Sequence, residues 1–138
     1  MADIRFDTGV KEFNINGAVT VRFSPTDMNF IEKVYNALEN IDKKEEAYRA
    51  ESSSLKGDEI FELSHRVDAE AREEINAIFG DDICTPVFGD LSLYAVADGF
   101  PIWANLLLAI VDQLDGAFAA EKKKTNPRIA KYTAKYKR

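Results

Sequence analysis

The sequence predicts a mainly α protein, α+β at the margin, with a β-hairpin at its N-terminus and a basic C-terminal segment. Three long stretches carry apolar residues at spacings of three and four, as helices with one buried face do. An Asn16-Gly17 pair between two short apolar runs predicts the hairpin. The 138 residues, 46% of them hydrophobic, suit one domain with its own core. We assign residues 1–125 to this domain and residues 126–138 to the basic segment.

The first 23 residues are expected to form strands. Ile4 and Phe6 alternate with polar residues, and the runs Val10–Ile15 and Ala18–Phe23 flank the Asn16-Gly17 pair. Alternation of this kind places the apolar side chains on one face of a strand. The hairpin should therefore cover part of a helical core.

The apolar pattern also bears on the register of the hairpin. A two-residue loop would place Phe13 opposite Thr20 and would send the apolar side chains of the two strands to different faces. A three-residue loop at residues 15–17, with Gly17 in the left-handed conformation, pairs Phe13 with Val19 and aligns one apolar face. We favour this second register.

The first long helix has a detailed start signal. Ser24 can cap it, Pro25 then occupies the first helical position, and Asp27 stands where a capping box has an acid. Phe23 and Met28 are spaced as a hydrophobic staple. The apolar face that follows comprises Met28, Ile31, Val34, Tyr35, Leu38 and Ile41.

The second half of this helix is too polar to be buried by this chain alone. Asp42–Glu51 is charged almost throughout, with Ala47 and Tyr48 left on the apolar face. The helix could run to about Ser52, a length of about 40 Å at 1.5 Å per residue. Such a surface is available for a partner.

The second long helix is expected to be capped by Asp58, to end at Gly80 and to pack antiparallel to the first. Its apolar residues are Ile60, Phe61, Leu63, Val67, Ala71, Ile75 and Ile78. Residues 81–100 are irregular, apart from a short turn of helix at Ile83–Phe88 and a turn at Asp98-Gly99.

The third long helix is expected to begin at Pro101 and to end before Asn126-Pro127, because the residue before a proline disfavours helix. Its apolar face is the widest of the three, so it should be the central core helix. The residues of this face are Ile102, Trp103, Leu106, Leu107, Ile110, Val111, Leu114 and Phe118.

Residues with catalytic potential are few, and a structural interpretation is favoured for each. The single histidine, His65, is expected on the surface near Asp68, and the single cysteine, Cys84, is expected to be a buried thiol among apolar residues. Trp103 is expected in the core rather than in a ligand pocket. With one Cys and one His, a zinc site within one chain is not expected, and no glycine-rich phosphate motif is present. We therefore expect no enzymatic activity, no metal and no cofactor.

The distribution of charge indicates binding. Residues 122–138 hold eight Lys or Arg and no acid, whereas residues 1–121 hold ten Lys or Arg and twenty-four Asp or Glu, a formal charge of −14. A cationic segment on an anionic body can fold back, dock on a neighbouring copy or reach a separate acidic partner. The residues expected to make this contact are Arg128, Ile129, Lys131, Tyr132, Lys135 and Tyr136. The expected receiving surface is Glu45, Glu46, Glu70, Glu73 and Glu74.

Other partners fit this segment less well. Lys and Arg interleaved with Tyr132 and Tyr136 could bind nucleic acid, but the acidic body would repel it. Ile129 and two tyrosines bury little in lipid, and no run reaches the roughly 20 apolar residues that span a bilayer. A protein partner, including another copy of the chain, is favoured.

Several short motifs spread over nearly the whole chain resemble those of one protein family. In the first two helices they are Ser24-Pro25-Thr26-Asp27 with Asn29-Phe30, Lys43-Lys44-Glu45-Glu46-Ala47-Tyr48, and Asp68-Ala69-Glu70 with Arg72. Further along they are Val87-Phe88-Gly89-Asp90, Tyr94-Ala95, Ala97-Asp98-Gly99, Trp103-Ala104-Asn105, Asn126-Pro127-Arg128-Ile129, Lys131-Tyr132 and Lys135-Tyr136. The chain thus resembles small phage and prophage proteins of Gram-positive hosts that belong to the tail-morphogenesis region.

This resemblance implies a tail assembly chaperone, which keeps the long tape-measure protein soluble until tail protein polymerises around it. Such a protein is non-enzymatic, mainly helical, prone to form homo-oligomers and located in the cytoplasm of the bacterial host. The alternative is a structural component of the virion, such as a head–tail connector or a minor tail protein.

Overall fold

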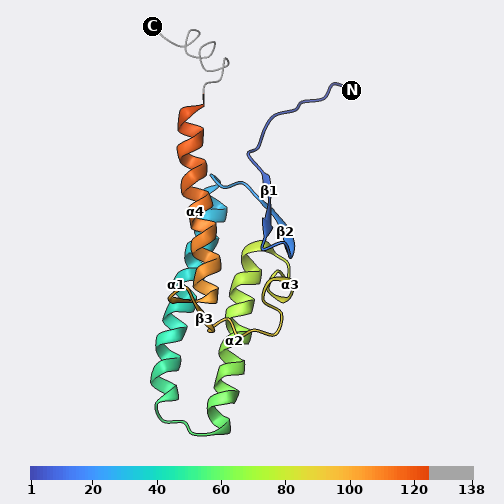
Figure 1. Ribbon diagram of the computed structural model, residues 1–138. Helices are drawn as coiled ribbons and strands as arrows, with labels where there is room; N and C mark the ends of the chain where they lie inside the picture. The colour runs from blue at the N-terminus through green and yellow to red at the C-terminus, as the bar shows by residue number, and fades with distance from the viewer. Residues whose placement is uncertain (125–138) are drawn as a thin grey trace.

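Within residues 1–124, which the computed structural model describes, three long helices and a short one are joined by loops and two small β-hairpins (Figure 1). In chain order the elements are β1 (Lys11–Ile15), β2 (Val19–Phe23), α1 (Met28–Ser52), α2 (Asp58–Phe79), α3 (Cys84–Phe88), β3 (Val96–Ala97), β4 (Phe100–Pro101) and α4 (Ile102–Lys123). The expected mainly α fold with an N-terminal hairpin is confirmed. The basic segment, residues 126–138, lies outside the described residues, and so does the domain boundary expected at residue 125.

The N-terminal hairpin has a different register from the expected one. Phe13 pairs with Val21, and Val19 pairs with Ile15. The expected pairing of Phe13 with Val19 is therefore wrong by two residues. Because side chains alternate with a period of two, this shift keeps the apolar side chains of both strands on the same face.

The reason for the difference lies in the turn. Asn16 and Gly17 both have positive φ, 52° and 73°, and the Ala18 N–H donates to the Ile15 carbonyl at 2.9 Å. Positive φ at both residues is what Asn-Gly favours in a turn, and it leaves Ile15 in the strand. The loop therefore has the expected three residues but spans Asn16–Ala18 instead of residues 15–17. The Asn14 side chain supports the turn by accepting a hydrogen bond from the Gly17 N–H at 2.6 Å.

Residues 1–10 do not form the expected strand. They have no regular secondary structure, and β1 begins only at Lys11. Ile4 and Phe6 remain 91% and 72% exposed. An alternating pattern is not enough for a strand when no neighbouring strand satisfies its backbone groups. We call residues 1–6 the N-terminal arm.

The first long helix, α1, begins three residues later than expected. Its N-cap is Asp27, whose carboxylate accepts from the Asn29 N–H at 3.0 Å. Ser24 instead accepts a backbone hydrogen bond from Asp27 at 3.1 Å in the preceding turn. The expected staple is also absent, because Met28 is 66% exposed. The far end is confirmed, since α1 runs to Ser52.

The second long helix packs antiparallel to the first, as expected (Figure 1). Its N-cap is Gly57 rather than Asp58, and Gly80 ends it in the left-handed conformation, as expected. Ile60 and Phe61 are exposed, so the buried face begins only at Leu63. These two residues lie in the first turn of α2, at the end of the helical hairpin.

A stack of phenylalanine rings joins the hairpin to the helices. The rings of Phe13 and Phe23 are stacked with centroids 4.2 Å apart, and those of Phe23 and Phe30 are also 4.2 Å apart. Phe79, near the end of α2, packs against Phe23 and Phe30 at 6.3 and 6.0 Å in tilted geometry. The hairpin, α1 and α2 therefore share one aromatic cluster.

The last helix, α4, is less enclosed than expected of a central core helix. Its buried residues form one stripe, namely Trp103, Ala104, Leu107, Ile110 and Leu114. Only 28% of its most apolar 18-residue window is buried, and its C-terminal turns extend beyond the other elements (Figure 1). By length and composition alone α4 could also span a membrane.

Replacing the central ring of the stack tests its contribution to stability. Phe23→Ala removes a buried side chain that contacts three other rings, so the free energy of unfolding should fall by about 3–5 kcal/mol. Urea denaturation measures it. The matched control is Phe61→Ala, whose side chain is 66% exposed and which should change stability by about 0.5 kcal/mol or less. An equal loss of unfolding free energy in both variants would show that the phenylalanine stack does not stabilise the fold.

Candidate protein-binding groove

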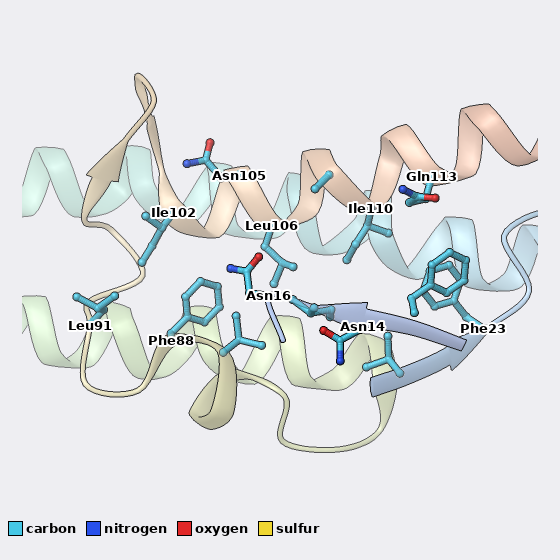
Figure 2. A pocket seen from close by; sticks show the side chains of 15 residues that line it. Asn14, Asn16, Phe23, Phe88, Leu91, Ile102, Asn105, Leu106, Ile110 and Gln113 are labelled. Carbon is cyan, nitrogen blue, oxygen red and sulfur yellow. The ribbon is translucent and has the colours of Figure 1, made fainter. Parts of the chain in front are cut away.

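A half-open groove lies between the N-terminal hairpin, α3 with the loop that follows it, and α4 (Figure 2). Its volume is about 440 Å³, within the range of about 300–1,000 Å³ usual for ligand sites. Fifteen residues line it, eleven of them apolar and four of them amides. The amides are Asn14, Asn16, Asn105 and Gln113.

The chemistry of the groove suits an apolar protein segment. None of the fifteen lining residues is ionisable, so its walls offer apolar area and amide hydrogen bonds rather than acid–base chemistry. Two amides are already oriented by the fold. Asn105 donates to the Ala97 carbonyl at 2.8 Å, and Asn14 accepts from Gly17. No local pattern in the sequence predicts this groove, because its walls come from four separate stretches of chain.

The short helix α3, which supplies Val87 and Phe88 to the groove, is held by a side chain of α2. The Asn76 amide oxygen accepts from the backbone N–H groups of Ile83 and Cys84, at 2.9 and 3.1 Å. These two donors precede the first helical hydrogen bonds of α3 and would otherwise lack partners. Asn76 therefore joins the end of α2 to the start of α3.

Asp82 supports the same helix start. Its carboxylate accepts from the Thr85 hydroxyl at 2.6 Å and from the Thr85 N–H at 3.1 Å. These bonds lower the pKa of Asp82 below its ordinary value, and the bond from the Thr85 hydroxyl has the largest effect. The Asn76 amide also donates to Asp82 at 3.1 Å, which closes the network.

The loop after α3 is fixed by an arginine and an aspartate of α2. Arg72 donates from Nη2 to the carbonyls of Gly89 and Leu91 at 2.8 and 2.7 Å, and from Nε to Asp68 at 3.0 Å. The other oxygen of Asp68 accepts from the Leu93 N–H at 2.7 Å. We call this pair the Asp68–Arg72 clamp. It positions Leu91, which lines the groove.

Sequence reasoning missed this clamp. Asp68 was expected near His65, and no contact was predicted for Arg72. In the structure the side chains of Asp68 and Arg72 are only 23% and 19% exposed. Their spacing of four residues on α2 was a usable signal for an ion pair, but not for the loop that the pair binds.

The expected acidic receiving surface is partly engaged within the chain. Glu74 pairs with Lys44 at 3.3 Å and accepts from Asn40 at 3.3 Å, which links α1 to α2. Glu45 pairs with Arg49 at 3.1 Å. The other three expected residues, Glu46, Glu70 and Glu73, make no ion pair within residues 1–124.

Glu45 of α1 and Glu70 of α2, two of the expected acids, both lie near the phenol of Tyr94. Burial is the main cause that raises the pKa of this phenol to about 12, and the negative charges of Glu45, Glu70 and Asp68 add to it. Glu46 and Glu73 are exposed on the two helices. The residues expected to bind this surface, Arg128, Ile129, Lys131, Tyr132, Lys135 and Tyr136, lie outside the described residues.

The burial of the remaining candidates, Cys84, His65 and Trp103, is as expected. Cys84 is fully buried, and burial raises the pKa of its thiol from an ordinary 9.0 to about 12. His65 is exposed, and Asp68 bonds Arg72 instead of His65. Trp103 is 4% exposed, and its Nε1–H has no hydrogen-bond partner within residues 1–124. The part of the chain that the structure describes holds no cluster of three potential metal ligands.

Comparison of the chain with protein-family models, with curated proteins and with solved structures found no match.

The Asp68–Arg72 clamp can be tested by mutation. Arg72→Ala removes three charge-assisted hydrogen bonds and should lower the free energy of unfolding by about 2 kcal/mol. It should also speed hydrogen exchange of the amides in residues 89–93. Arg49→Ala, which removes an exposed arginine from an ion pair of the same i,i+4 spacing, should cost about 1 kcal/mol or less. Unchanged exchange in residues 89–93 would show that the clamp does not hold the loop.

Burial of the Cys84 thiol predicts a pH dependence. The unfolded thiol ionises above its ordinary pKa of 9.0, whereas the folded thiol stays protonated up to about 12. Its contribution to stability is therefore complete below pH 9 and is lost as pH rises towards 12. Between pH 9 and 10, the free energy of unfolding should fall more steeply in the wild type than in Cys84→Ala. If the unfolding free energies of the two proteins fell in parallel with pH, the thiol of Cys84 would not be buried as described.

Proposed function

We propose that this chain is a non-enzymatic phage tail morphogenesis protein, a tail assembly chaperone that binds an apolar segment of the tape-measure protein. The observation that supports this proposal is the uncharged, mainly apolar groove beside α4. An amphipathic helix that lays its apolar face into such a groove is a common mode of peptide recognition.

The groove and the body would have separate roles in this function. Apolar walls from β1, β2, α3 and α4 would cover the client, and the groove amides would bond its polar edge. Residues 1–124 carry thirteen Lys or Arg and twenty-four Asp or Glu, a formal charge of −11. A large net charge of one sign opposes aggregation, which is what a protein that keeps an apolar client soluble requires.

The basic segment would add a second contact in this proposal. Its Lys and Arg residues would reach the acidic surface of a neighbouring copy or of the client, while Ile129, Tyr132 and Tyr136 add apolar area. Glu46, Glu70 and Glu73 are the acids of that surface without an ion pair in the described part of the chain. They are the residues that such a segment would meet first.

The function can be tested by coexpression with the tape-measure protein of the same phage. Wild-type chain should hold that protein in a soluble complex, measured by size-exclusion chromatography. Ala109→Glu places a charge in the uncharged groove at an exposed position, so the bound fraction should fall by about tenfold. Phe61→Ser, an exposed apolar position on α2, is the control and should bind as the wild type does.

Two results would contradict the proposal. One is a tape-measure protein that stays insoluble with the wild-type chain. The other is equal binding by Ala109→Glu and the wild type.

A structural virion component is the second candidate, and the exposed N-terminal arm favours it. Arms with exposed apolar side chains are suited to permanent contacts between subunits, and Ile4 and Phe6 have this character. Mass spectrometry of finished particles separates the two functions. A chaperone is absent from the particle, whereas a connector or a minor tail protein is present.

A further inference from the structure

The N-terminal arm carries two large apolar side chains that its own chain leaves uncovered. Ile4 is 91% exposed and Phe6 is 72% exposed. In a strand, residues two apart point to the same side, so these two side chains would form one short apolar edge if the arm were added to a sheet. Asp3 and Arg5 lie on the alternate positions and pair with each other at 3.6 Å.

The base of the arm is held in a defined bend. The Asp7 carboxylate accepts from the Gly9 N–H at 2.8 Å, and the Thr8 hydroxyl accepts from the Val10 N–H at 3.4 Å. Gly9 has a φ of +79°, and a Cβ on it would lie 3.1 Å from the Ser24 hydroxyl oxygen. This bend directs the arm away from the helices (Figure 1). The arm therefore does not cover the groove of its own chain.

The groove has features that complement those of the N-terminal arm. Four consecutive residues, Phe13–Asn16, line it, so at the turn end of β1 the groove reaches the edge of the strand as well as one face. β1 pairs only with β2 among the described residues, and its other edge has no strand beside it. An unpaired edge next to apolar pockets is the arrangement that accepts an added strand.

We propose that the N-terminal arm of one copy docks in the groove of a second copy. The arm lies along the free edge of β1, with Ile4 and Phe6 in the groove and with Asp3 and Arg5 towards solvent. The arm is nearly neutral, which matches walls without an ionisable group. The basic segment is a poorer occupant, because residues 125–138 hold five Lys or Arg and no acid.

This contact joins two different surfaces, an arm and a groove, so each copy can give one and receive one. Reciprocal exchange closes a dimer, and exchange in one direction around a circle closes a ring. The inference goes beyond the proposed function, because the partner is the chain itself. The arm and the client would occupy the same groove, so a client that binds there would displace the arm. The test of this inference contains no client, so failure of the test leaves the proposed function untouched.

Sedimentation velocity of the full chain over a range of concentrations tests the inference. The arm variant is Ile4→Ser with Phe6→Ser, and the groove variant is Ala109→Glu; all three positions are exposed. Each variant should raise the dissociation constant of self-association by about tenfold or more. Phe61→Ser, which removes an equally exposed ring from α2, should associate as the wild type does.

Mixing the two variants gives the more specific result. The arm variant keeps its groove and the groove variant keeps its arm, so an equimolar mixture should form a pair that neither variant forms alone. A synthetic peptide of residues 1–8 should dissociate the wild-type assembly, and the same peptide with both serines should not. The peptide keeps the test valid if the groove variant fails to fold.

Several outcomes would overturn the inference. These are a wild-type chain that stays monomeric at all concentrations, an arm variant that associates as the wild type does, and an assembly that the wild-type peptide leaves intact.

Discussion

The stack of Phe13, Phe23 and Phe30 is the interaction on which the rest of the structure depends. A two-stranded hairpin is marginally stable by itself, and here its inner face is fixed to α1 and α2 through ring contacts at 4.2 Å. Because the hairpin packs on these helices at one end, its β1 side stands apart from α4. The groove is the space that this arrangement leaves between the hairpin and α4.

The other wall of the groove depends on polar contacts made by α2. Asn76 holds the start of α3, and the Asp68–Arg72 clamp holds the loop after it. The described residues carry a formal charge of −11. Two of the charged side chains, Asp68 and Arg72, hold the loop that places the apolar Leu91 in the groove wall. The result is an uncharged groove in a strongly acidic body, which separates the surface for apolar contact from the surface that keeps the protein in solution.

The sequence predicts elements well where the signal is local, and it fails where partners are distant. The helices, the Asn16-Gly17 turn and the buried Cys84 follow from spacing and from turn chemistry. The apolar pattern correctly predicts a three-residue loop and one shared apolar face, but the loop lies one residue later, at Asn16–Ala18, so Phe13 pairs with Val21. Asp68 and Arg72 looked like surface charges because the loop that they bind follows about twenty residues later. The groove needs four elements in place and has no local signature.

Nuclear magnetic resonance of the isolated chain, at a concentration low enough to keep it monomeric, tests whether the phenylalanine stack and the open groove exist together in solution. Nuclear Overhauser effects should connect the rings of Phe13, Phe23 and Phe30. A soluble paramagnetic agent should broaden the Ala109 methyl, which lines the groove and is exposed, and should spare the buried methyls of Leu107. Rings without mutual Overhauser effects, or an Ala109 methyl as protected as those of Leu107, would show that the hairpin does not hold the groove open.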